Sequence, residues 1–156
     1  MSDKATNRGV THETLTFERT YRVPPQRVFA AYADVAARAR WGTPSDTAAI
    51  VYSAADFSVG GQDAYRCGAK DDLRFRGITR YEDIVENQRI VYVESVSTQG
   101  KLLAVSLITW ELLPHEQGTR LIVTDQLTAL DGSDMSAGTR FGMNAALDNL
   151  ARELAG

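Results

Sequence analysis

Residues that could act as nucleophiles or as general acids and bases are few in this chain of 156 residues. His12 lies in a polar N-terminal stretch and His115 in a predicted hairpin turn, so we expect both to be solvated rather than catalytic. The only cysteine, Cys67, has Arg66 and Lys70 nearby, which could lower the pKa of its thiol. A lone cysteine in a strand is more commonly a small core residue, and we favour that interpretation. Two histidines and one cysteine also lack metal-ligand spacing, so we expect no metal, no other cofactor and no catalytic residue.

Three charged residues could face the interior of the predicted fold: Arg19, Glu82 and Asp125. Arg19 shares a strand face with Phe17, and Asp125 shares one with Val123. A buried charge must be paired or reach water, because burying it alone costs several kcal/mol. We favour a structural salt bridge among these residues over a polar anchor that orients a ligand carboxylate or hydroxyl. An enzyme that works inside a cavity is a further alternative, and its sign would be a carboxylate with a strongly raised pKa facing the empty space.

The composition indicates one ordinary globular domain. Hydrophobic residues make up 44% and charged residues 24% of the chain, as in ordered domains. The net charge of −3 provides no basic field for phosphates, so we expect no nucleic acid partner. No apolar run approaches the roughly 20 residues that span a bilayer, so we expect no membrane span, and with one cysteine we expect a cytoplasmic location. Residues 1–12 are expected to form a disordered tail and residues 13–156 a single domain.

Most of the chain alternates between apolar and polar residues, a period of two that is typical of strands with one buried face. Pro24-Pro25 ends the first of these segments, because proline has no backbone donor for a sheet. Strands are expected at 13–23, 49–53, 63–67, 73–83, 89–96, 102–113 and 119–130.

Helical periodicity replaces the alternation in three places. Val28, Phe29 and Tyr32 follow the two prolines at helical spacing, and Asp34 can cap a second short helix that ends near Trp41. A long amphipathic C-terminal helix is predicted by the apolar stripe Met143, Leu147, Leu150 and Leu154. The pattern as a whole predicts an α+β domain, in which a curved antiparallel sheet of about six strands wraps around the C-terminal helix.

This architecture predicts a ligand cavity. One helix is roughly 10 Å across, narrower than six strands spaced about 4.8 Å apart, so space remains where the sheet curves around it. Large inward side chains could instead fill this space completely. Trp41 could gate the mouth of the cavity or pin the second helix to the sheet. The residues expected to line the cavity are Tyr32, Trp41, Tyr65, Phe75, Tyr92, Ile108, Trp110, Phe141 and Leu147.

Five short segments, in order along the chain, resemble motifs of START-like (SRPBCC) proteins. The branch they resemble most is the C-terminal-domain type of the activator of the ninety-kilodalton heat-shock protein ATPase. The segments are Arg19-Thr20-Tyr21-Arg22-Val23-Pro24, Trp41-Gly42-Thr43-Pro44, Phe57-Ser58-Val59-Gly60-Gly61, Glu82-Asp83-Ile84 with Arg89-Ile90-Val91-Tyr92, and Gly118-Thr119-Arg120-Leu121.

The resemblance implies the helix-grip fold and, commonly, an apolar cavity between the sheet and the last helix, but it does not fix an activity. It also implies that Phe141 takes the place of a tryptophan that the family carries at the start of that helix. We therefore expect non-catalytic binding of a small hydrophobic or amphipathic molecule. The alternative partner is a chaperone whose ATPase the protein modulates, and a homodimer through exposed sheet edges is also open.

Overall fold

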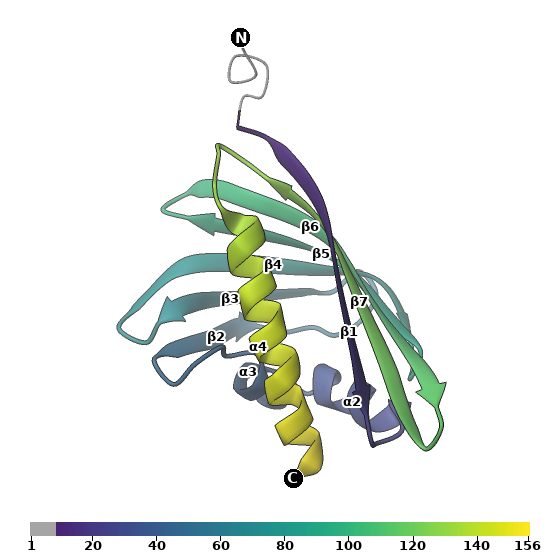
Figure 1. Ribbon diagram of the computed structural model, residues 1–156. Helices are drawn as coiled ribbons and strands as arrows, with labels where there is room; N and C mark the ends of the chain where they lie inside the picture. The colour runs from purple at the N-terminus through teal and green to yellow at the C-terminus, as the bar shows by residue number, and fades with distance from the viewer. Residues whose placement is uncertain (1–8) are drawn as a thin grey trace.

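The computed structural model describes residues 9–156, and Figure 1 shows one sheet curved around one long helix. The strands pair in the order β1-β7-β6-β5-β4-β3-β2, and every pair is antiparallel. The expected α+β helix-grip fold is confirmed, with seven strands where about six were expected. The elements in chain order are β1 (Thr11–Tyr21), α2 (Pro25–Ala33), α3 (Val35–Trp41), β2 (Ala48–Ala54), β3 (Gln62–Ala69), β4 (Asp72–Val85), β5 (Arg89–Thr98), β6 (Lys101–His115), β7 (Gly118–Ala129) and α4 (Met135–Ala155).

The first strand begins two residues earlier than expected. His12 lies in β1 and pairs with Thr128 of β7, so residues 11 and 12 belong to the sheet rather than to the predicted tail. The backbone pairing with β7 holds this segment in place even though its side chains are exposed. Residues 9 and 10 precede the strand, and residues 1–8 of the predicted tail lie outside the described residues.

The two short helices form where the sequence signals placed them. Pro25 stands in the first turn of α2, where its fixed φ suits the helix and its missing N–H is not needed. Asp34 caps α3, because its carboxylate accepts hydrogen bonds from the backbone N–H groups of Ala36 at 3.0 Å and Ala37 at 3.3 Å. Figure 1 shows that both helices close the end of the curved sheet where the C-terminal half of α4 lies.

The largest side chains of the core pack beside α2 and α3. There the C-terminal half of α4 is fully packed, with Leu147 and Leu150 at 0% exposure. Large aromatic rings complete this part of the core, and the Tyr32 ring contacts those of Trp41, Tyr81, Tyr92 and Trp110 with centroids 5.0 to 6.3 Å apart. Side chains therefore fill part of the space between sheet and helix, whereas the alternative named in the sequence analysis was that they fill it completely.

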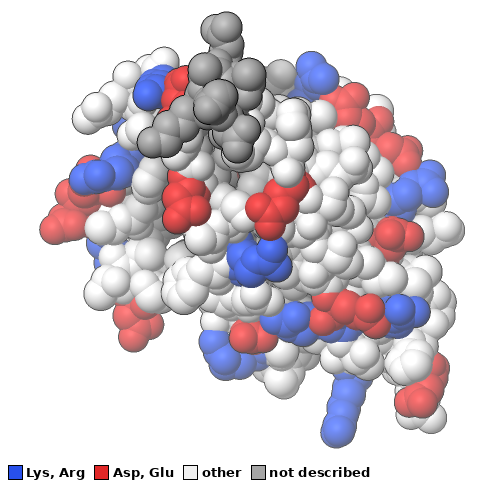
Figure 2. All heavy atoms as spheres, turned by 45° about the horizontal axis from the view of Figure 1, so that its top comes forward, with Lys and Arg blue, Asp and Glu red and all other residues white. Residues whose placement is uncertain are grey.

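The remaining surface features of the described residues are unremarkable for a globular domain. Figure 2 shows Lys and Arg interspersed with Asp and Glu on the face in view, rather than gathered by sign. None of the helices within residues 9–156 combines the length and the apolar character needed to cross a membrane.

Candidate functional site

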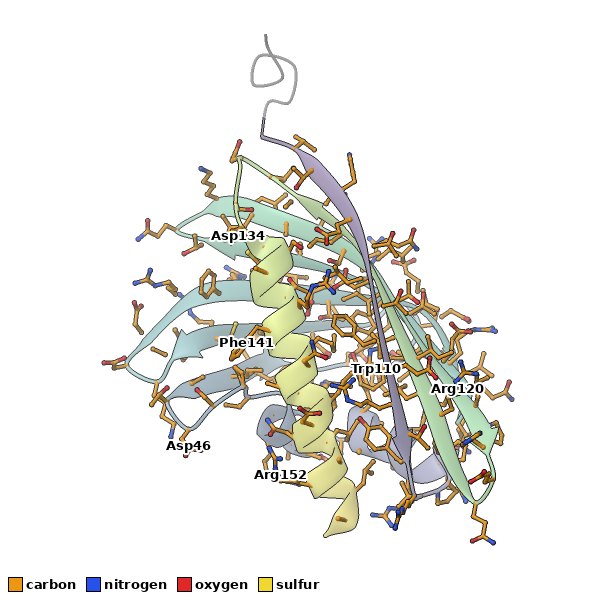
Figure 3. The ribbon with its side chains drawn as sticks, viewed as in Figure 1. Asp46, Trp110, Arg120, Asp134, Phe141 and Arg152 are labelled. Atoms are coloured by element: carbon orange, nitrogen blue, oxygen red, sulfur yellow. The ribbon has the colours of Figure 1, made fainter. Side chains whose placement is uncertain are left out.

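A cavity of about 540 Å³ lies between the concave face of the sheet and the N-terminal half of α4. It exists because α4 presents small residues to the sheet at a spacing of four: Gly138, Gly142 and Ala146. A Cβ atom added at Gly138 or Gly142 would meet no other atom within 4 Å. A larger hollow of about 730 Å³ lies outside the sheet, around Asp46 and Arg152 (Figure 3), but its exposed walls are mainly polar. The inner cavity is therefore the better ligand site.

A row of four polar side chains crosses the concave face beneath this cavity. The sheet register places Asp63 opposite Thr79, Thr79 opposite Glu94, and Glu94 opposite Ser106. Successive members lie on neighbouring strands from β3 to β6, and all four residues have the same orientation because side chains alternate along a strand. We call these four residues the polar row. It divides the aromatic core from the more open part of the cavity.

One end of the polar row is fixed by a buried ion pair between Arg38 of α3 and Asp63. The Nη2 atom of Arg38 lies 3.0 Å from Oδ2 of Asp63, and the two side chains are 6% and 2% exposed. The remaining guanidinium nitrogens donate to the Tyr32 carbonyl at 2.8 Å, the Tyr81 hydroxyl at 3.2 Å and the Tyr52 hydroxyl at 3.2 Å. The guanidinium also lies over the rings of Tyr32 and Tyr52, 4.6 and 5.1 Å from their centroids. Every nitrogen of this cation is thus engaged by the protein.

The middle of the cavity holds two carboxyl groups, Glu94 and Asp125. Burial raises the pKa of Glu94, and the nearby Asp125 carboxyl adds to the rise, whereas a hydrogen bond of 2.7 Å from the Tyr65 hydroxyl opposes it. Burial also raises the pKa of Asp125, and the Ser106 hydroxyl opposes this only in part. Asp125 is 1% exposed, and its Oδ1 atom has no hydrogen-bond partner within the described part of the chain. Both pKa values are raised, although not strongly, whereas the sign of cavity chemistry named in the sequence analysis was a strong rise.

Tyr65 is held in position by a glycine on the neighbouring strand. Gly77 lies directly opposite Tyr65, and the tyrosine ring covers the glycine so closely that any Cβ there would overlap it.

We expect Gly77→Ala to push the Tyr65 ring away from Glu94 and to lower the free energy of unfolding by about 1–3 kcal/mol, because the site would be overpacked. Urea denaturation measures this loss, which reports overpacking alone because Gly77 does not have a positive φ. A stability unchanged by Gly77→Ala would contradict the packing described here.

The structure brings most of the expected cavity residues together. Those that line it are Tyr32, Trp41, Tyr65, Phe75, Tyr92, Ile108 and Trp110, together with the expected polar residue Asp125. Trp41 also donates from Nε1 to the Ala31 carbonyl at 3.0 Å, and its ring lies 5.8 Å from that of Trp110. Of its two proposed roles, these contacts support pinning α3 to the sheet.

Four expected site residues lie elsewhere. Phe141 (Figure 3) is 69% exposed and borders a shallow groove beside Glu13 of β1 rather than the cavity. Leu147 is a core residue outside the cavity lining. Glu82 is exposed and pairs with Arg80 at 2.6 Å, because it follows the buried Tyr81 and side chains alternate along a strand.

Arg19 is the fourth of these residues, and it joins β1 to α4 instead of reaching Asp125. Its guanidinium contacts Asp148 at 3.3 Å and donates to Asn144 at 3.0 Å. Arg19 therefore forms a salt bridge, but its partner is Asp148 and not Asp125 or Glu82. The polar groups that sequence reasoning missed are Arg38, Asp63, Thr79, Glu94 and Ser106.

Cys67 also lines the cavity, but its thiol is not activated. Burial raises the pKa of this thiol from 9.0 to about 11, and Glu94 adds to the rise, so the effect of Arg66 and Lys70 considered from the sequence is outweighed. We expect Cys67 to react with a disulfide reagent at pH 8 about a hundredfold more slowly in the folded protein than in urea, because two pKa units reduce the thiolate fraction by that factor. Similar rates in the two states would show that the thiol is exposed and ordinary.

The buried Asp125 carboxylate should cost stability at neutral pH. Its pKa is raised in the folded state, so the folded protein binds the proton more tightly than the unfolded chain, and stability falls as pH rises from the ordinary to the raised pKa. We expect Asp125→Asn to be more stable than the parent protein at pH 8, and this advantage to shrink as the pH is lowered through that window. Urea denaturation of both proteins from pH 4 to 8 measures the difference. An advantage that does not change with pH would show that the carboxylate is not the cause.

Comparison with known proteins gives this geometry a context. Residues 22–155 match the family described as Activator of Hsp90 ATPase homolog 1-like protein. The crystal structure of Mll3558 protein from Rhizobium loti is 38% identical, with 92% of this chain and 98% of that chain covered and a TM-score of 0.82. An uncharacterized protein from Rhizobium leguminosarum is 28% identical over 94% of this chain and 96% of that chain, with a TM-score of 0.83.

More distant structures are similar in fold alone. DynU16, a protein of the dynemicin biosynthetic locus, is 17% identical over 91% of this chain and 47% of that chain, with a TM-score of 0.66. No match was found among curated proteins.

Proposed function

Because this chain belongs to the Activator of Hsp90 ATPase homolog 1-like family, which does not by itself fix an activity, we propose from the cavity that it binds a small amphipathic molecule. The observation that carries the proposal is the space of about 540 Å³ left where α4 presents glycine and alanine to the sheet. Volumes of this size suit a single drug-sized molecule. The open part of the cavity supplies apolar contacts from Phe75, Val96 and Met143, and Glu94 and Asp125 supply polar ones.

Binding of a neutral apolar dye tests this proposal. N-phenylnaphthylamine should gain fluorescence on entering the cavity, and native mass spectrometry should show one dye per chain. Trp41 and Trp110 both line the cavity, so their emission should be quenched by the bound dye in the same titration. Absence of dye binding, of quenching and of any bound mass would refute a ligand cavity.

A cavity enzyme is the second candidate, and the raised pKa values of Glu94 and Asp125 favour it. A carboxyl that stays protonated closer to neutral pH can act as a general acid. Incubation of the protein with each molecule that binds, followed by mass spectrometry of that molecule, separates the two candidates. Unchanged ligand mass and structure support binding alone, whereas a product that Glu94→Gln no longer forms would support catalysis.

Modulation of a chaperone ATPase, which the family description suggests, stays a prediction of the sequence analysis. It would need an exposed apolar surface for the partner. The exposed large apolar side chains, such as Val59 and Phe141, are 62% and 69% exposed but lie on different elements of the fold. The cavity is the better supported site.

A further inference from the structure

The cavity contains a hydrogen-bond acceptor that the protein leaves unused. Asp125 stands near the middle of β7, opposite Leu15 of β1 and Ile108 of β6, so apolar side chains flank it on both neighbouring strands. It is 1% exposed and lines the cavity, yet its Oδ1 atom accepts no hydrogen bond from any of residues 9–156. Buried polar atoms are nearly always paired, and an exception calls for a missing partner. The missing partner of Asp125 is a donor.

The charges around the cavity identify the kind of donor. Among the described residues that line it, four are acids, namely Asp63, Glu94, Asp125 and Asp134, and one is a cation, Arg38. Arg38 is already neutralised by Asp63 and donates from all three nitrogens to protein groups. The remaining carboxyls therefore face the cavity without a cation of their own.

We propose that the ligand is an apolar amine, whose ammonium group donates to Asp125 while Glu94 supplies a second negative charge. This inference rests on the proposed ligand cavity and specifies its chemistry. The apolar body of the ligand lies against Gly138, Gly142 and Met143 of α4, where the helix leaves space. The ammonium group reaches the polar side of the cavity, where Glu94 lies opposite Ser106 and Asp125 belongs to the next strand.

An anionic ligand fits these surroundings poorly. A carboxylate or phosphate would need Arg38, but that guanidinium already donates four hydrogen bonds within the protein and is balanced by Asp63. It would also be placed near Glu94 and Asp125, and like charges in a site of low dielectric repel strongly. An ammonium group is instead attracted to both carboxylates and reduces the repulsion between them.

The proposal predicts how binding depends on pH. The titratable groups that face Asp125 and Glu94 are Tyr32 of α2, Arg38 of α3, Tyr52 of β2, Asp63, Tyr65 and Cys67 of β3, Tyr81 of β4, Tyr92 of β5, and Asp134 at the start of α4. The tyrosines and Cys67 have raised pKa values and stay neutral, and Arg38 stays charged. Ionisation of Glu94 and Asp125 is therefore what changes as the pH rises through their raised pKa values, and affinity for an amine should rise with it.

A matched series of three molecules tests the proposal: naphthylmethylamine, naphthylmethanol and naphthoic acid. They share one aromatic body and differ in charge. In calorimetry at pH 7.5, with displacement of N-phenylnaphthylamine as a second readout, we expect the amine to bind at least about tenfold more tightly than the alcohol and the acid to bind most weakly. Asp125→Asn should remove most of the advantage of the amine and leave the alcohol unchanged. Glu82→Gln, at an exposed carboxylate outside the cavity, is the matched control and should change neither.

The outcomes separate this inference from the proposed function. If the dye binds but the amine has no advantage over the alcohol, or the acid binds most tightly, the amine proposal is overturned and the ligand cavity stands. An advantage of the amine that survives Asp125→Asn, or that Glu82→Gln removes, would also overturn it, since the ammonium group would then lie elsewhere. If neither the dye nor any of the three molecules binds, the ligand cavity itself is refuted.

Discussion

Replacement of Gly142 by leucine is expected to abolish binding of N-phenylnaphthylamine while making the protein more stable. The new side chain would enter the cavity, because nothing lies within 4 Å of a Cβ atom at this position. Gly142 is also a helix-interior residue of α4, and replacing glycine by leucine there favours the helix by about 0.5–1 kcal/mol. Dye titration measures the first effect, for which we expect at least a tenfold loss of affinity, and urea denaturation measures the second.

The opposite signs of these two effects make the result specific to the cavity. A variant that lost binding because it was misfolded would be less stable, not more. Ala137→Leu is the matched control, since it enlarges an exposed residue on the same helix but outside the cavity lining. Normal dye binding by Gly142→Leu would contradict the position assigned to the ligand.

The sequence revealed both the resemblance to START-like proteins and the fold, because both depend on patterns of residues that are close together in the chain. Alternation with a period of two and strand-like runs between turn signals marked the seven strands, and the stripe from Met143 to Leu154 marked α4. Pro25 and Asp34 fixed the beginnings of α2 and α3. Each of these signals acts within a few residues, so no knowledge of distant contacts was required.

Phe141 shows how a resemblance can override a better physical signal. It was placed in the cavity because the family carries a tryptophan near this point. Yet Phe141 and Met143 are two residues apart, which is about 200° around a helix, so the face that buries Met143 must expose Phe141. The helical phase also places Gly138, Gly142 and Ala146 on one face, which could have identified the cavity wall.

Glu94 could have been found from the sequence, whereas Arg38 could not. Glu94 shares its strand parity with Tyr92, which was correctly expected to face the cavity. Arg38 lies in a short helix, and its partner Asp63 is 25 residues away in a separate strand. Pairing of this kind depends on how α3 docks at the end of the sheet, and a single sequence contains no local signal for that.

Replacement of Asp63 by alanine is expected to lower the free energy of unfolding by about 3–5 kcal/mol, because it would leave the Arg38 charge buried without a partner. Asp63 also accepts from the Tyr81 hydroxyl at 2.5 Å and from the backbone N–H of Asp56 at 3.1 Å, so two further donors would lose their acceptor. Urea denaturation measures the loss. Glu82→Ala, which breaks an exposed pair with Arg80, is the control and should change stability by less than about 1 kcal/mol.

A double variant tests whether the cost arises from the unpaired charge. Arg38→Met combined with Asp63→Leu removes both charges and keeps apolar volume, and such replacements of buried ion pairs are often neutral. We therefore expect the double variant to recover a large part of the stability that Asp63→Ala loses. If the double variant loses as much stability as Asp63→Ala, the hydrogen bonds from Arg38 to the Tyr32 carbonyl and the Tyr81 hydroxyl are what stabilise this end of the polar row. Dye binding by the double variant also shows whether the charged pair is needed to hold the aromatic residues that line the cavity in place.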